Sequence, residues 1–387
     1  MDLAAVLRAA QTTDPASVVT LVGAAARDIG ASDVVAYVVD FEQRVLEPIP
    51  DHSAHADVPH VEEVTTTMAG RAFLTRAPVT VERPDGTRVW VPIVEGSDRT
   101  GVLAMTLPQV DDRLLGSCAD LGLLAGYLIA AHTRCTDYFQ LHRRRKAMSL
   151  AASMQWDLLP PLVLRTPACD LVARLEPAYD VGGDSFDYAL NGNVLDVALI
   201  DAMGHGVTAS SIASLVIGSY RHGRREARTL ASISATLDEV LDRQHAGEAF
   251  STGWLGQLEV ETGALTWTSA GHPCPLVIRN GQVVKELEGP VNLPWGLGGV
   301  RVDPAQEFLE PGDAVLVYTD GVIEARTADG DEFGIDRLAD VAGQCASNQL
   351  VPEEFVRKLV ETVLDHQYAE LRDDATVLLF EWHGSAS

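Results

Sequence analysis

The chain has 387 residues, 47% of them hydrophobic and 22% charged, a composition typical of a soluble globular protein. This length exceeds what one hydrophobic core usually supports, so two domains are expected. The formal net charge of -26 makes nucleic acid and anionic membrane surfaces poor partners, and most of the carboxylates should be solvated surface.

Cysteine usage and hydropathy indicate a cytoplasmic protein. The five cysteines form no Cys-x-x-Cys pair, so neither a disulfide framework nor a zinc site is expected, and a reducing compartment fits best. The N-terminus lacks the apolar core of a secretory signal. The most apolar stretch, residues 121–131, is shorter than the roughly 20 residues that span a bilayer, so it predicts a buried helix and no membrane partner.

The first third of the chain predicts a small α/β domain. Asp14 and Pro15 are a helix cap and a first-turn proline, and a helical apolar pattern follows them. Four apolar segments bounded by turn residues then predict strands, at residues 34–39, 77–81, 89–94 and 101–107. A second helical pattern begins at Asp111. This order over residues 12–135 resembles a GAF domain, which implies sensing of a small-molecule or protein ligand, or dimerisation.

Residues 136–161 are expected to form a linker helix between the domains. Within residues 138–160, apolar side chains recur at spacings of three and four residues, as on one face of a helix. Such a face belongs either to ordinary core or to a signalling or dimerising surface, and both interpretations stay open. The pair Pro160 and Pro161 ends the helical pattern and marks a domain boundary.

The remaining residues, 162–384, are expected to form a strand-rich domain. Apolar segments at residues 194–200, 314–318 and 376–380 predict buried strands, and Asn280-Gly281 predicts a type I′ hairpin within 276–284. Two helices are expected, at about 210–220 and 230–243. The connections favour an antiparallel sheet sandwich flanked by helices, so the whole chain is of the α+β class.

Aspartates gather in turns at the edges of these apolar segments. Asp201 follows one strand, Asp320 follows another, and Asp373 and Asp374 precede a third. Hard cations such as Mg²⁺ and Mn²⁺ prefer carboxylate, carbonyl and water oxygens, and aspartates brought close together would repel one another without a cation. Adjacent glycines allow sharp turns or a close approach to a ligand; they are Gly182, Gly183, Gly204, Gly206 and Gly321.

Each of these motifs alone is ordinary turn chemistry, but their joint order resembles a known family. The segments PAYDVGGDSFD, DAMGHG, SAGHPCP, PGDAVLVYTDGVIEAR, DEFG and DDAT occur in the order found in PPM phosphatases, which are protein phosphatase 2C-like. The bacterial branch typified by the stage II sporulation protein E is the most similar. The resemblance covers roughly residues 165–383 and implies an α-β-β-α sandwich.

The resemblance also implies a site that holds two Mn²⁺ or Mg²⁺ ions. Asp184 and Asp201 would be metal ligands and, through metal-bound water, the catalytic residues, with Asp201 bridging both ions. The backbone carbonyl of Ala202 would join them, and Asp320 and Asp373 would complete the second ion's ligands. Asp374 is the second choice at the last position. No organic cofactor is implied.

The implied reaction is in-line attack of metal-held water on a phosphoserine or phosphothreonine, without a covalent intermediate. The implied substrate is a phosphorylated signalling protein, in particular an anti-sigma-factor antagonist, and a homodimer regulated by the N-terminal domain is expected. His205 and His272 titrate near neutral pH when unperturbed, but a structural role is favoured for both. The alternatives are a catalytically silent signalling scaffold and a ligand-sensing dimerisation module.

Overall fold

The computed structural model describes residues 3–50, 59–180, 182–290, 292–298, 304–367 and 373–384. The chain divides into two compact units, the first ending at Ala147 and the second beginning at Met148. Each unit has its own sheets and its own hydrophobic core.

The first unit is built on one antiparallel sheet with the strand order β3-β2-β1-β6-β5-β4. Its strands are β1 (Ser32–Val39), β2 (Val45–Ile49), β3 (Glu62–Glu63), β4 (Val79–Arg83), β5 (Gly86–Glu95) and β6 (Asp98–Leu107). The four predicted strands correspond to β1, β4, β5 and β6. The sequence analysis missed β2 and β3, because β2 contains Glu47 and Pro48 and β3 has only two residues.

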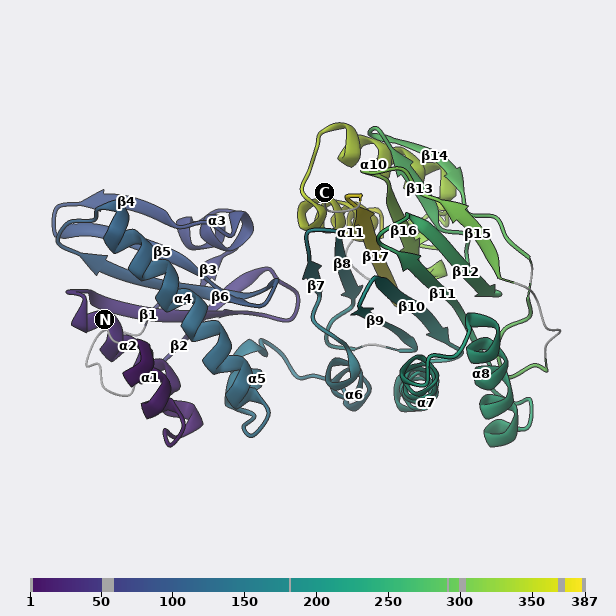
Figure 1. Ribbon diagram of the computed structural model, residues 1–387, viewed down its shortest axis with the longest axis horizontal. Helices are drawn as coiled ribbons and strands as arrows, with labels where there is room; N and C mark the ends of the chain where they lie inside the picture. Colours follow the sequence, from purple (N-terminus) through teal and green to yellow (C-terminus); the bar gives the residue numbers. More distant parts are fainter. Residues whose placement is uncertain are drawn as a thin grey trace. The chain divides into compact units, whose positions relative to one another are not determined.

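Helices cover both faces of this sheet (Figure 1). They are α1 (Leu3–Ala10), the 3-10 helix Pro15–Ser17, α2 (Val18–Asp28), α3 (Met68–Thr75), α4 (Asp112–Thr133) and α5 (Tyr138–Arg143). Successive residues of a strand face opposite sides. Accordingly, Ala36 and Val38 of β1 belong to the core under α1, α2 and α4, whereas Tyr37 and Val39 belong to the core under α3.

Helix α4 is long and apolar enough to cross a membrane, judged by length and composition alone. In this unit it packs on β5 and α2, with one face buried in the core. Two of its glycines allow the close approach. A β-carbon on Gly122 would lie 2.4 Å from the Pro92 carbonyl oxygen, and one on Gly126 would lie 1.9 Å from the Val94 carbonyl oxygen.

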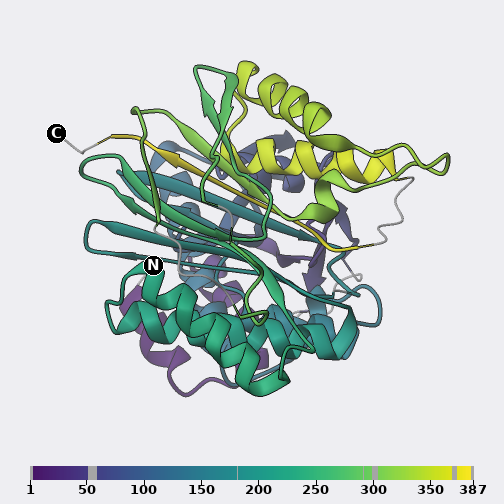
Figure 2. The same ribbon diagram turned by 90° about the vertical axis from the view of Figure 1, so that its right-hand side faces the viewer.

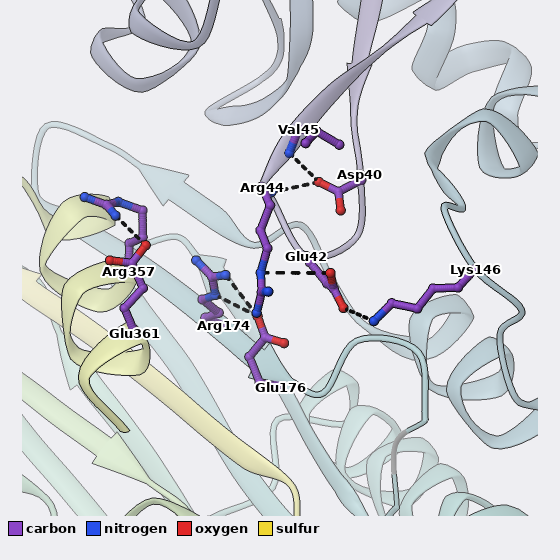
Figure 3. A network of polar contacts seen from close by, with 9 residues as sticks. All are labelled: Asp40, Glu42, Arg44, Val45, Lys146, Arg174, Glu176, Arg357 and Glu361. Carbon is purple, nitrogen blue, oxygen red and sulfur yellow. Dashed lines mark hydrogen bonds and ion pairs between the residues drawn. The ribbon is translucent and has the colours of Figure 1, made fainter. Parts of the chain in front are cut away.

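The expected continuous helix over residues 138–160 is wrong. Helix α5 ends at Arg143, and a new helix, α6 (Leu150–Leu158), begins after Ser149, whose hydroxyl accepts a hydrogen bond from the Ala152 amide. The interruption has a local cause, because contacts within the first unit hold the intervening chain. Arg143 donates to the Val39 carbonyl, and Lys146 pairs with Glu42 at 2.7 Å (Figure 3).

The second unit contains two antiparallel sheets. One has the order β15-β12-β11-β10-β9 and the other β14-β13-β16-β17-β8-β7. The strands are β7 (Val163–Arg165), β8 (Cys169–Glu176), β9 (Asp184–Asn191), β10 (Val194–Ala202), β11 (Ser251–Glu259), β12 (Ala264–Ala270), β13 (Leu276–Arg279), β14 (Gln282–Glu286), β15 (Ala305–Phe308), β16 (Ala314–Tyr318) and β17 (Ala375–Trp382). Side chains from both sheets share one core, with Trp254 and Phe380 in contact across it.

Helices enclose this sandwich on both outer faces, as Figure 2 shows. One face carries α7 (Gly206–Arg225) and α8 (Leu230–His245), and the other carries α10 (Gly334–Ser347) and α11 (Pro352–His366). The predicted sandwich flanked by helices is confirmed, although only α7 and α8 were anticipated. The predicted hairpin is also confirmed: Asn280 and Gly281 both have positive φ, at 51° and 78°, as a type I′ turn requires.

We predict that Gly126→Ala lowers the free energy of unfolding of the first unit by about 1–3 kcal/mol, because the added methyl group cannot fit against Val94. Gly116→Ala is the matched control on the same helix, where a β-carbon meets nothing within 4 Å. The Gly116→Ala substitution should raise the free energy of unfolding by about 0.5–1 kcal/mol. Urea unfolding with hydrogen exchange on α4 measures both, and equal effects of the two variants would contradict this packing.

Candidate functional site

Four of the predicted site residues lie at one end of the sandwich in the second unit. Asp184 is the first residue of β9 and lies directly opposite Asp201 of β10 in the strand register. Side chains that face each other on neighbouring antiparallel strands have β-carbons about 5 Å apart. From the other sheet, Asp320 follows β16 and Asp373 precedes β17.

Glycines allow the backbones to meet at this end. A β-carbon on Gly183 would lie 2.0 Å from the carbonyl oxygen of Ala202, and one on Gly321 would lie 1.9 Å from the carbonyl oxygen of Asp374. Any larger residue would therefore force these segments apart. Gly204 and Gly206 have positive φ, at 89° and 68°, so the DAMGHG turn also depends on glycine. The expected sharp turns are confirmed at Gly204 and Gly206, whereas Gly183 and Gly321 allow backbone segments to pack closely together.

Hydrogen bonds lock the two sheets together beside the aspartates. The Thr319 hydroxyl donates to Asp184 Oδ2 at 2.6 Å and accepts from the Thr376 amide at 3.0 Å. Asp374 Oδ2 accepts from the amides of Gly182 at 2.6 Å and Asp184 at 3.2 Å. Asp184 is thus held both through its side chain and through its backbone.

Burial and mutual repulsion raise the carboxyl pKa values in this cluster. Burial, followed by the charges of Asp201 and Asp374, raises the pKa of Asp184 well above its usual range. Burial raises the pKa of Asp201 to about 7, with contributions from Asp320, Asp373 and Asp374. Burial first, then Glu324 and Asp373, also raises the pKa of Asp320. The cluster therefore carries more negative charge than its protein surroundings stabilise.

The residues present fit hard divalent cations. In the described ranges, no three His, Cys, Asp or Glu side chains are arranged around a common ion position. Two of the aspartates instead direct oxygens at Thr319 and at backbone amides. The donor set nevertheless consists of carboxylates and the Ala202 carbonyl, which Mg²⁺ and Mn²⁺ prefer. In the described part of the second unit, no ion pair with Lys or Arg balances Asp184, Asp201, Asp320 or Asp373.

Asp373 and Asp374 occupy different environments. Asp374 is buried, and burial raises its pKa to about 6 although backbone amides that donate to it act in the opposite direction. Asp373 is exposed, and one of its oxygens accepts from the Asp374 amide at 2.9 Å. Asp374 thus holds the Gly182–Asp184 backbone in place, whereas Asp373 keeps a solvent-facing carboxylate beside Asp201 and Asp320.

The two histidines of the motifs also differ in burial. His272 is buried, and burial lowers the pKa of its ring to about 3, so it is neutral near pH 7. Its Nδ1 lies 3.2 Å from the Thr252 hydroxyl, and Ser269 accepts from its backbone amide. These contacts support the favoured structural role for His272. His205 is exposed at the N-terminus of α7.

Two residues that position the site were missed by the sequence analysis. Thr319 lies within the YTDG motif, next to Asp320, and its bond to Asp184 is visible only once the two sheets face each other. Ser210 of α7 lies 3.1 Å from the Gly182 carbonyl and 3.3 Å from the Ala151 carbonyl of α6. Its hydroxyl therefore lies between α6 and the GGD motif. No signal in the sequence distinguishes Ser210 from other helical serines.

We predict that the cation-free protein loses stability as pH rises. The pKa of Asp201 is about 7 when folded and about 4 when unfolded, so the folded chain binds its proton more tightly. This contribution is fully present below about pH 4 and is lost as pH rises through 7. Thermal melts in EDTA should show it, and Asp201→Asn should flatten the slope by at most about 1.4 kcal/mol per pH unit. Asp242→Asn, at an exposed position of α8, should leave the slope of stability against pH unchanged.

The second unit is similar to known proteins. Residues 191–383 match the family model described as Stage II sporulation protein E (SpoIIE). Phosphoserine phosphatase RsbU of Bacillus subtilis is 23% identical over 239 residues, which are 61% of this chain and 70% of that protein.

Solved structures show the same fold. The crystal structure of RsbU and RsbW domains from Mycobacterium tuberculosis is 25% identical with a TM-score of 0.50, and the match covers 57% of this chain and 63% of that one. The SiaA-PP2C domain of Pseudomonas aeruginosa is 23% identical with a TM-score of 0.51, covering 60% and 93%. The C-terminal half of this chain is therefore a PPM-type serine/threonine phosphatase domain of the stage II sporulation protein E kind.

Proposed function

We propose that this chain is a metal-dependent phosphatase that hydrolyses phosphoserine or phosphothreonine on a signalling protein. The observation that carries this proposal is the placement of Asp184 opposite Asp201, with Asp320 and Asp373 contributed by the facing sheet. The raised pKa values of Asp184, Asp201 and Asp320 indicate an uncompensated anionic cluster. An acidic protein needs such a cation site to accept a dianionic phosphate.

Each ligand has a proposed role. Asp201 lies between Asp184 on its own sheet and the pair Asp320 and Asp373 on the other, so it would bridge two Mn²⁺ or Mg²⁺ ions. The Ala202 carbonyl, which Gly183 approaches closely, would join Asp184 on the first ion. Asp320 and Asp373 would hold the second. Asp374 is engaged by backbone amides, which favours Asp373 at this position.

Neighbouring protein groups would orient the ligands of the cations. Bound divalent ions supply charge neutralisation for the phosphoryl group and activation of water. Thr319 orients the Asp184 carboxylate, and Asp374 orients its backbone. His272 is buried and neutral, so it is not the acid that protonates the leaving oxygen. No nucleophilic side chain is required, because water is the attacking group.

The substrate class follows by analogy. A relative named phosphoserine phosphatase RsbU supports phosphoserine as the target. We therefore infer a phosphorylated anti-sigma-factor antagonist as the physiological substrate. The proposed location is the cytoplasm, in keeping with five cysteines outside any disulfide.

The first unit is proposed to be a GAF-like regulatory domain that binds a small molecule or protein and forms a homodimer. Its single antiparallel sheet, with helices on both faces and a long helix α4 after the last strand, supports that proposal. Helix α6 offers a route for regulation within the second unit. The Ser149 amide donates to the Tyr179 carbonyl, and the Trp156 indole donates to the Ala178 carbonyl, just before the GGD motif.

We predict that Asp201→Asn abolishes hydrolysis of para-nitrophenyl phosphate and of a phosphoserine peptide, because the carboxylate shared by both ions is lost. Wild-type turnover should require Mn²⁺ or Mg²⁺ and vanish in EDTA. Asp374→Asn is the comparison, since an amide oxygen can still accept from Gly182 and Asp184, and it should retain measurable activity. A fully active Asp201→Asn enzyme would refute the assigned ligands, and a folded but inactive wild type would favour the scaffold alternative.

We further predict that Ser210→Ala raises the Mn²⁺ concentration needed for half-maximal activity, without changing kcat at saturating Mn²⁺. Losing one buried hydrogen bond costs about 0.5–1.5 kcal/mol, which corresponds to a shift of up to roughly tenfold. Ser211→Ala is the control, because that hydroxyl bonds only within α7 and is exposed. Identical metal titrations for both variants would exclude a role for the α6 contact.

A further inference from the structure

A cavity of about 650 Å³ lies at the opposite end of the strands that carry the aspartates. It is lined by Ala189 and Asn191 of β9 and by Val194 and Asp196 of β10. Asn191 lies seven positions after Asp184, a span of about 23 Å along a strand. The cavity is therefore separate from the phosphatase site.

Arginines dominate the charge of this cavity. Arg224, Arg225 and Arg228 line it, from the end of α7 and the turn before α8. Among the described lining residues, Asp196 is the one carboxylate, and it accepts hydrogen bonds from Gln257 at 2.9 Å and Asn191 at 3.3 Å. Positive charge thus prevails locally in a chain whose net charge is -26.

Two of these guanidinium groups, those of Arg225 and Arg228, have no carboxylate partner among the described residues. Arg224 pairs with Asp187 at 2.9 Å, as does its neighbour Arg221 at 2.8 Å. Within the described second unit, the other arginines that form ion pairs are Arg165, Arg174, Arg243, Arg279, Arg326 and Arg357. In the same described part, no ion pair joins Arg225 or Arg228 to an acidic side chain.

The rest of the lining suits a phosphate attached to an organic body. Guanidinium groups bind phosphate oxygens in a two-pronged geometry. Thr229 caps the 16-residue helix α8, whose N-terminal dipole favours an anion beside it. Ala189, Val194 and Ala227 add apolar surface. A volume of this size is in the range of small-ligand pockets, whereas an acidic protein would need a broader contact face.

We propose that this cavity binds a phosphate-bearing small molecule of nucleotide size, with Arg225 and Arg228 as the phosphate-binding side chains. Binding here is independent of the phosphatase reaction, because none of the lining residues belongs to the aspartate cluster. Helix α7 runs from the DAMGHG turn, which contains Asp201, to Arg225 at the cavity. A ligand on the arginines would thus contact the same rigid helix that borders the catalytic end.

The test is isothermal titration calorimetry of the full chain in EDTA, which prevents cation-dependent binding at the aspartates. ADP is the probe, with adenosine, inorganic phosphate and a decaglutamate peptide as comparisons. We expect one saturable ADP site, with at least tenfold weaker binding of adenosine and of phosphate. Arg225→Gln/Arg228→Gln should weaken ADP binding at least tenfold. Both side chains are solvent-accessible, so the variant should melt at the wild-type temperature.

The matched control is Arg243→Gln/Lys285→Gln, which removes the same charge from exposed positions outside the cavity and should bind ADP as the wild type does. The proposal is overturned if ADP shows no saturable binding or if the cavity variant binds it unchanged. Adenosine or inorganic phosphate binding as tightly as ADP would overturn it as well. Tighter binding of decaglutamate than of ADP would identify a docking surface for an acidic protein instead.

Discussion

Repulsion among carboxylates at the meeting point of two sheets is the constraint on which this phosphatase unit depends. Asp184 and Asp201 face each other across β9 and β10, and Asp320 and Asp373 reach them from the second sheet. Folding removes these groups from much of their contact with water, and burial disfavours their charged forms. In the absence of cations, this arrangement lowers the free energy of unfolding. The same negative electrostatic potential would attract divalent cations to the site.

The protein holds this unfavourable arrangement with neutral hydrogen bonds and close backbone packing. Thr319 and the buried Asp374 connect the sheets beside Asp184, and Gly183 and Gly321 let the carbonyls of Ala202 and Asp374 approach. The sheet that contains β9 and β10 has a hydrophobic core on each face, and these cores hold its strand ends in place. The packing of the whole sandwich therefore offsets the repulsion among these like charges. Functional sites often carry such locally unfavourable interactions, which the rest of the fold compensates.

The same sandwich supports two different electrostatic environments. Strands β9 and β10 end in aspartates on one side, and on the other they border a cavity lined with arginines. Helix α7 connects the two ends and packs on α6, and its Ser210 hydroxyl lies within hydrogen-bond distance of the Ala151 carbonyl of α6 and of the Gly182 carbonyl. The aspartate end is thus linked to α6 by hydrogen bonds and to the basic cavity by one continuous helix.

The sequence alone determined the strand-rich second unit, the Asn280-Gly281 hairpin and the aspartate motifs, because apolar alternation, turn chemistry and motif order are local properties. It missed α10 and α11, and it joined α5 and α6 into one helix, because an amphipathic pattern does not report the tertiary contacts that interrupt it. Only the tertiary structure decided that Asp374 accepts backbone amides while Asp373 stays accessible. Neighbouring identical residues differ through burial and partners, which depend on chain segments nearly two hundred residues away.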